Sequence, residues 1–154
     1  MIKEINYSVS FSDPLTHYCE VSINIKGIAT EALLFSMPVW TPGSYMIRDY
    51  AGKVQNETAT DNKGQCRSSE KISKNTWRVQ TGGSKEINFS YRVYCNELTV
   101  RTSEVTSEHA FLNNSGVFMF VRGYENLPCR LNINLPKQWK EVSTGLEQTG
   151  KNKY

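Results

Sequence analysis

The side chains that most often carry chemistry in proteins are sparse in this chain of 154 residues. It has two histidines, His17 and His109, which lie far apart in strand-like surroundings, and it contains no His-Glu-x-x-His sequence. Zinc-dependent hydrolysis needs two histidines one helical turn apart, with a glutamate as the general base. A Gly-x-Ser-x-Gly motif and a glycine-rich phosphate loop are also absent. We therefore expect no catalytic residue and no metal ligand in this chain.

The four cysteines, at positions 19, 66, 95 and 129, show no paired spacing of the kind that binds a metal. Cys19, Cys95 and Cys129 are each in step with alternating apolar residues of a strand-like segment. This pattern predicts three small, buried, reduced side chains. A disulfide would require an oxidising compartment.

The densest group of large and charged side chains runs from Met37 to Ala51. Pro38 ends the preceding apolar run because proline has no N–H for a strand ladder. Pro42-Gly43 then has the chemistry of a tight turn. The candidate contact residues of this segment are Trp40, Tyr45, Arg48, Asp49 and Tyr50.

Two interpretations of this segment are open from the residues alone. In the structural one, it is a corner between strands in which Trp40 and Tyr45 cap a core and Arg48 and Asp49 neutralise each other. In the functional one, it is a rigid loop presented to a partner surface, because ordered loops rich in side chains often carry recognition. Periodicity does not separate the two.

Composition and charge limit the class of protein. Hydrophobic residues make up 38% and aromatic residues 11% of the chain, which argues for one folded domain with a substantial core. Eighteen basic and fifteen acidic residues leave a net charge of +3 without a basic run, so we expect no nucleic-acid partner. No apolar stretch approaches the ~20 residues of a membrane helix, and the polar N-terminus lacks a signal-peptide pattern. We therefore expect a cytoplasmic protein without membrane contact.

Strand patterns dominate the sequence, and no window carries a helical apolar stripe. The alternating segments 5–11 and 21–25 predict an antiparallel pair with one buried and one wet face. Further strands are predicted at 32–37, 77–79, 86–95, 98–102, 116–122 and 130–135. Turn residues separate them, including a predicted hairpin turn at Thr81-Gly82-Gly83-Ser84. The fold class is all-β, an antiparallel β-sandwich or curved sheet in a single domain.

The domain is predicted to span residues 1–146. From Glu147 onward the sequence is polar and offers no apolar side chains for packing. Residues 147–154 are therefore predicted to begin a linker.

A known family is similar to this sequence over almost its whole length. Pro38 to Tyr45 reads Pro-Val-Trp-Thr-Pro-Gly-Ser-Tyr and continues as Ile47-Arg48-Asp49-Tyr50-Ala51. This string resembles the hallmark of the N-terminal domain in the glycyl-aminopeptidase family of zinc metallopeptidases, metallopeptidase family sixty-one. Other features follow in a similar order: His17, Trp77-Arg78-Val79, Tyr91 to Tyr94, Leu98 to Arg101, Ala110 to Asn113 and Trp139.

The resemblance implies a non-catalytic N-terminal β-domain that packs beside a catalytic domain and shapes its substrate cleft. Members of the family bind zinc through a His-Glu-x-x-His helix and a downstream glutamate, and usually carry a PDZ domain. Zinc is thus expected only in the absent catalytic domain, and this chain alone should be inactive. The partners implied are that catalytic domain, in cis, and the peptide substrate of the parent enzyme.

The resemblance also suggests roles for the candidate residues. Trp40 and Tyr45 would be apolar anchors at the contact between domains. Arg48 would pair with an acidic group of the partner domain or a substrate carboxylate, and Asp49 would meet a substrate amino group.

An alternative remains open. The chain could be a free-standing β-sandwich module that binds carbohydrate or protein through exposed aromatic side chains, such as those of Trp40, Tyr45, Tyr50 or Trp77. A third interpretation, a structural or adhesion domain of a larger surface protein, is disfavoured by the lack of a signal-peptide pattern.

Overall fold

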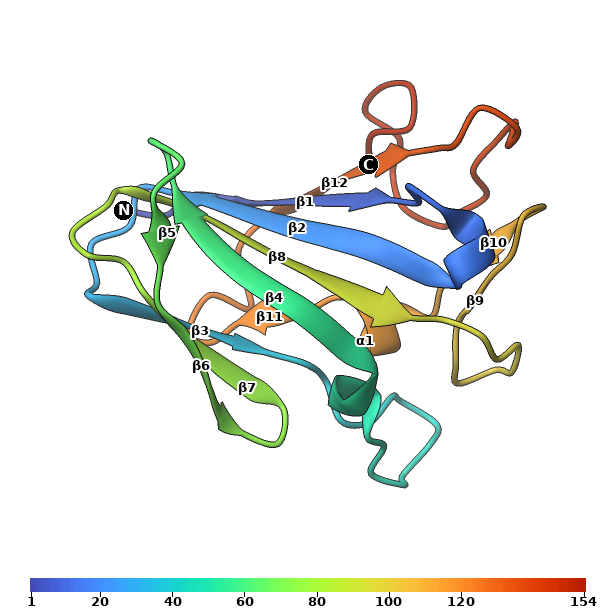
Figure 1. Cartoon of the computed structure of the whole chain (residues 1–154), viewed down its shortest axis with the longest axis horizontal. Helices are drawn as coiled ribbons and strands as arrows, with labels where there is room; N and C mark the ends of the chain where they lie inside the picture. Colours follow the sequence, from blue (N-terminus) through green and yellow to red (C-terminus); the bar gives the residue numbers. More distant parts are fainter.

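The computed structural model describes all residues, 1–154, and shows two packed β-sheets (Figure 1). The larger sheet has six strands in the order β12-β1-β2-β8-β4-β5. Their bounds are β1 Ile5–Ser10, β2 Tyr18–Lys26, β4 Val54–Asp61, β5 Cys66–Arg67, β8 Glu86–Tyr94 and β12 Cys129–Asn134. Neighbouring strands are antiparallel except β1 and β12, which are parallel.

The smaller sheet has four strands in the order β11-β3-β7-β6. Their bounds are β3 Ala32–Ser36, β6 Ser69–Ser73, β7 Thr76–Gln80 and β11 Phe120–Val121. A separate two-stranded ribbon pairs β9, Glu104–Val105, with β10, Ala110–Phe111. Three short helical turns complete the chain: η1 Pro14–Thr16, η2 Tyr50–Lys53 and α1 Asn114–Val117.

The core lies between the two sheets. Every second residue of β2 and β8 is buried, which is the period-two pattern expected of strands with one covered face. Across the interface, the rings of Phe35 and Phe89 lie 4.4 Å apart between centroids. The prediction of an all-β sandwich is confirmed. So is the antiparallel pairing of β1 and β2, in which Ile5 lies opposite Ile25.

Several local predictions differ from the structure. Residues 98–102 form a loop rather than a strand, and the segment 116–122 is divided between α1 and β11. The turn at Thr81–Ser84 connects β7 of the smaller sheet to β8 of the larger one, so it does not close a hairpin. Cys19 and Cys95 are buried as predicted, but Cys129 is exposed because it lies at the start of the edge strand β12.

The C-terminal residues lie along strand β12. Leu131 in β12 and Tyr154 exchange two backbone hydrogen bonds, with N–H to O=C distances of 2.7 and 2.9 Å. The Ile133 N–H donates to the Asn152 carbonyl oxygen at 2.9 Å. The last residues therefore pair with part of the free edge of β12.

No helix in this chain has the length and apolar character needed to cross a bilayer.

The sheet geometry places two loops at one end of the sandwich. Residues 37–49, which we call the hallmark loop, connect β3 to η2 and the start of β4. Residues 97–103, which we call the Thr99 loop, follow the end of β8. Because Val54 of β4 lies opposite Val93 of β8, both loops lie at the same end, which we call the loop end.

Candidate functional site

The hallmark loop is anchored at both of its ends. Met37 is fully buried, and its N–H donates to the Asn75 carbonyl oxygen at 2.9 Å. The Met37 carbonyl in turn accepts a hydrogen bond of 2.7 Å from the Asn75 side chain. Near the other end, the Arg48 N–H donates to the Val39 carbonyl oxygen at 2.7 Å. Hydrogen bonds therefore fix both ends of the loop, as in a compact surface loop whose ends lie close together.

The predicted tight turn lies within this loop. Gly43 has a φ of 83°, and the Ser44 N–H donates to the Thr41 carbonyl oxygen at 3.0 Å. Proline followed by a residue with positive φ is the signature of a type II turn, and only glycine adopts that conformation without strain. The turn at Pro42-Gly43 is confirmed.

Beyond the buried Met37, the large apolar side chains of the hallmark loop are exposed to solvent. Trp40 is 51% exposed and Tyr45 92%, and Met46 and Ile47 are 63% and 76% exposed. The interpretation in which Trp40 and Tyr45 cap the core is therefore wrong. An ordered loop that holds a cluster of large apolar side chains in water is typical of a surface that a partner covers.

Arg48 and Asp49 do not neutralise each other. The Asp49 carboxylate pairs with Lys74 at 3.5 Å. Arg48 is half-buried, its Nη2 reaches the Ser44 hydroxyl only at 3.5 Å, and its buried Nε has no partner. A partly desolvated guanidinium without an acidic partner favours the binding of a carboxylate.

Tyr50 does not form part of the exposed surface. It is the first residue of η2, is 6% exposed and belongs to the hydrophobic core. Its ring packs so closely on α1 that a Cβ added at Gly116 would lie 3.2 Å from the Tyr50 Cδ1 atom. The expectation of an outer contact is corrected: Tyr50 fixes how η2 packs against α1.

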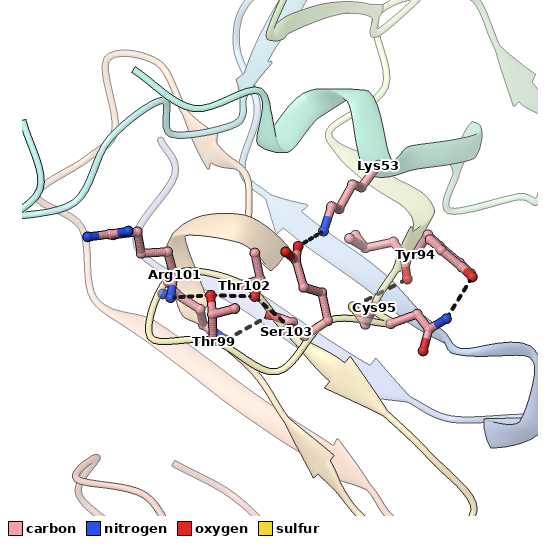
Figure 2. Close-up of polar contacts among 11 residues, drawn as sticks. Lys53, Tyr94, Cys95, Thr99, Arg101, Thr102 and Ser103 are labelled. Carbon is pink, nitrogen blue, oxygen red and sulfur yellow. Dashed lines mark hydrogen bonds and ion pairs between the residues drawn. The ribbon is translucent and has the colours of Figure 1, made fainter. Parts of the chain in front are cut away.

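The Thr99 loop is a second exposed element at the loop end, and sequence reasoning missed it by predicting a strand. Lys53 of η2 pairs with Glu97 at 3.3 Å, which joins this loop to the end of the hallmark loop (Figure 2). Leu98 is 58% exposed and Val100 82%. The available signal was the Thr-x-x-Thr sequence, because threonine hydroxyls support tight turns by bonding to nearby backbone groups.

A comparison with protein families identifies the domain. Residues 6–154 match the sequence profile of the Peptidase M61 N-terminal domain. The chain belongs to this family. The resemblance inferred from the hallmark string is thereby confirmed, and the loop end is a surface of the N-terminal domain of a peptidase.

Two solved structures are similar to this M61 N-terminal domain. An aminopeptidase N family protein from Idiomarina loihiensis matches 87% of the chain at 30% identity, with a TM-score of 0.81. An M1 zinc metallopeptidase from Deinococcus radiodurans, solved with a Tyr-Ser-Ala substrate, matches 99% of it at 8% identity and a TM-score of 0.46. The chain spans 22% of the first protein's length and 37% of the second's. No curated protein matches it significantly.

The side chains of this M61 domain do not fit a zinc ion. No group of three or more His, Cys, Asp or Glu side chains lies close enough together to hold a metal. His17 lies in the left-handed position after η1, not in a strand, and its Nδ1 lies 2.7 Å from the Val105 carbonyl oxygen. His109 Nε2 lies 3.1 Å from Glu104 Oε2. The two histidines belong to separate local contacts, and we derive no zinc chemistry from them.

The domain has a groove of about 530 Å³. It lies between the end of β1, strand β12 and residues 138–146, and its walls are mainly apolar. Trp139 forms part of the wall: its ring lies 4.8 Å from that of Phe11, and its Nε1–H donates to the Ser107 carbonyl oxygen at 3.0 Å. Its polar lining mixes acidic, basic and neutral side chains, so the groove does not indicate a ligand class.

Two of the four aromatic side chains proposed for a free-standing binding module are buried and cannot contact a ligand. Tyr50 is 6% exposed and Trp77 only 1%, with the Trp77 Nε1–H donating to Glu57 at 3.2 Å. Trp40 and Tyr45 remain exposed. Both lie on the hallmark loop, so the two functional hypotheses concern the same surface.

Proposed function

We propose that this domain packs beside the catalytic domain of a glycyl-aminopeptidase-like zinc metallopeptidase and forms one wall of its substrate cleft. The observation that carries the proposal is the hallmark loop. Anchored at both ends, it holds Trp40 and Tyr45 in water beside Arg48, whose guanidinium has no acidic partner. Nearly the whole chain matches the N-terminal domain of a peptidase family. The partner proposed for this surface is therefore the catalytic domain of the same polypeptide.

Each exposed side chain has a role that its chemistry supports. Trp40 and Tyr45 act as apolar anchors, since aromatic side chains dominate the energetics of protein interfaces. Arg48 pairs with a carboxylate of the catalytic domain or of the substrate. Asp49 meets the amino group of the peptide; its side chain is 54% exposed beside Lys74, so it can accept a further donor.

The rest of the proposal concerns the parent enzyme. Its substrates are peptides, its zinc is bound by residues of the catalytic domain, and it acts in the cytoplasm. A PDZ domain, where present, also lies outside these residues. The domain itself supplies binding and positioning, not hydrolysis.

The test is kinetic and uses the full-length parent enzyme carrying Tyr45→Ala or Arg48→Ala. Loss of a charge-assisted contact costs about 1.5–3 kcal/mol, so we expect kcat/KM for a peptide to fall about tenfold or more in Arg48→Ala. Melting temperatures should change little for Tyr45→Ala, because this side chain is almost fully exposed. Leu146→Ala and Arg78→Ala remove exposed side chains outside the two loops and serve as controls.

Normal stability, kcat and KM in both loop variants would eliminate the proposal. Carbohydrate binding by the 154-residue chain alone, lost in Trp40→Ala, would favour the binding-module alternative instead.

A further inference from the structure

The Thr99 loop is held in one conformation by its own hydrogen bonds. The Thr99 and Thr102 hydroxyl oxygens lie 2.7 Å apart, and the Thr102 hydroxyl donates to the Glu97 carbonyl oxygen at 2.7 Å (Figure 2). The Arg101 N–H donates to the Thr99 hydroxyl oxygen at 3.1 Å. Together these bonds close the loop below its tip, the residues Val100 and Arg101.

The loop is also fixed to its neighbours. The Asn113 side chain, which caps α1, donates to the Val100 carbonyl oxygen at 3.2 Å. The Asn113 N–H donates to the Ser103 hydroxyl at 2.9 Å, and Lys53 of η2 pairs with Glu97. The tip therefore has a defined position relative to α1 and to η2, where the hallmark loop ends.

What this ordered loop presents is apolar and cationic. Val100 is 82% exposed at the tip, Leu98 is 58% exposed, and Arg101 extends away from the loop without an ion pair (Figure 2). Tight turns favour glycine, asparagine, aspartate and serine for their backbone preferences. The turn itself does not require a valine or an arginine at the tip, so these side chains are available for a contact outside this domain.

The charges at the loop end indicate the chemistry of the partner. Both acidic side chains of the two loops are already paired, Asp49 with Lys74 and Glu97 with Lys53. Arg48 and Arg101 have no acidic partner among the ion pairs of the chain. The surface thus offers apolar side chains with two unpaired guanidinium groups, and its electrostatic complement is an apolar surface bearing carboxylates.

We infer that Val100 and Arg101 form a second contact with the catalytic domain: Val100 enters an apolar depression of that domain, and Arg101 pairs with a carboxylate beside it. The inference rests on the proposed function and extends it to a loop that the hallmark string does not include. The occupant is the rest of the same polypeptide, because the chain spans only 22% of the similar Idiomarina loihiensis protein and both loops share one end of the sandwich.

Hydrogen exchange tests the inference by comparing the 154-residue chain with the full-length protein. The N–H groups of Leu98 and Val100 donate no hydrogen bond within the chain, and neither do those of Met46 and Ile47. We expect all four to exchange at least tenfold more slowly in the full-length protein, because the partner covers them. Residues 62–65, at the other end of β4, should be unchanged.

The possible outcomes separate the two proposals. Protection of residues 46–47 without protection of residues 98–100 overturns this inference and leaves the proposed function standing. Protection of neither loop overturns both. Protection that grows with the concentration of the 154-residue chain identifies a second copy as the occupant, and protection that requires added peptide identifies substrate. Either result contradicts the inference.

A charge reversal gives a second, independent measurement. In the full-length protein, Arg101→Glu should remove most of the protection of residues 98–100, because it opposes a carboxylate on the partner. Arg78→Glu, on the smaller sheet, changes the net charge equally and should leave the protection unchanged. Equal exchange rates in the two variants would contradict a role for Arg101.

Discussion

The two ends of strand β4 carry turns of opposite character. At its C-terminal end, residues 61–65 form a turn whose central carboxylate is buried and fully engaged within the chain. At its N-terminal end lie the hallmark loop and the Thr99 loop, which expose large apolar side chains and two unpaired arginines. The same two strands, β4 and β8, run between them.

The acidic group of the turn at residues 61–65 is satisfied within the chain. The Asp61 carboxylate accepts hydrogen bonds from the Lys63 and Gln65 N–H groups at 2.8 and 2.9 Å, and from Arg67 Nη2 at 2.5 Å. Burial alone would raise the pKa of Asp61, but these donors together hold the pKa below its usual value. The charges at this turn are paired within the chain, although Arg67 Nε is buried without a hydrogen-bond partner, as Arg48 Nε is at the other end.

The loop end is ordered yet incomplete by the same criterion. Its backbone is anchored by hydrogen bonds at Met37, Arg48 and Ser103, while the guanidinium groups of Arg48 and Arg101 have no acidic partner. The difference shows that order alone does not mark a functional loop. The distinguishing feature is an anchored backbone that carries exposed apolar side chains and guanidinium groups without an acidic partner.

The largest predicted change in stability tests whether the two ends of β4 are stabilised by the same hydrophobic core. Phe89 lies in the middle of β8, is fully buried and packs on Phe35. Phe89→Ala should lower the free energy of unfolding by about 3–5 kcal/mol through lost burial and a cavity. Urea denaturation measures the loss, and hydrogen exchange should show both ends of β4 losing protection together. Independent unfolding of the two ends would contradict a single cooperative core.

A smaller change in stability is expected from a substitution in the turn at residues 61–65. Because the pKa of Asp61 is lower in the folded than in the unfolded chain, its ionised form stabilises the fold above about pH 4, and this contribution is lost as the pH falls through the folded pKa. Asp61→Asn should therefore lower the urea midpoint at pH 7, and the difference from the wild type should shrink toward pH 3.

Asp49→Asn at the loop end is the matched control. Both partners of the Asp49–Lys74 pair are more than half exposed, so this substitution should change stability by less than about 1 kcal/mol. If the two variants behaved alike at pH 7, the proposed contrast between the ends of β4 would be wrong.

Local chemistry made part of this structure predictable. β1 and β2 follow from alternation, because each has one face against the core, and the turn at Pro42-Gly43 follows from the backbone preferences of those two residues. The hallmark loop was recognisable from its density of large and charged side chains. The direction of Trp40 and Tyr45 was not predictable, because a ring at a corner can face the core or solvent with the same sequence pattern.

Other features depend on contacts that side-chain patterns do not record. β4 was missed because it is mostly polar and carries a bulge between Gln55 and Thr58, so little alternation remains. The pairing of Tyr154 with β12 uses backbone groups alone. The Thr99 loop was predicted as a strand because its residues are good strand formers, and its hydroxyl hydrogen bonds form only within the folded turn.

The smallest predicted effect on stability is the most informative about the loop end. In the 154-residue chain, Ile47→Ser and Val100→Ser should each change the free energy of unfolding by no more than about 0.5 kcal/mol, because both side chains are more than three-quarters exposed. A decrease in the free energy of unfolding of more than about 1 kcal/mol would mean that these side chains pack within the domain. The loop end would then lack the exposed apolar surface that distinguishes it from the turn at Asp61.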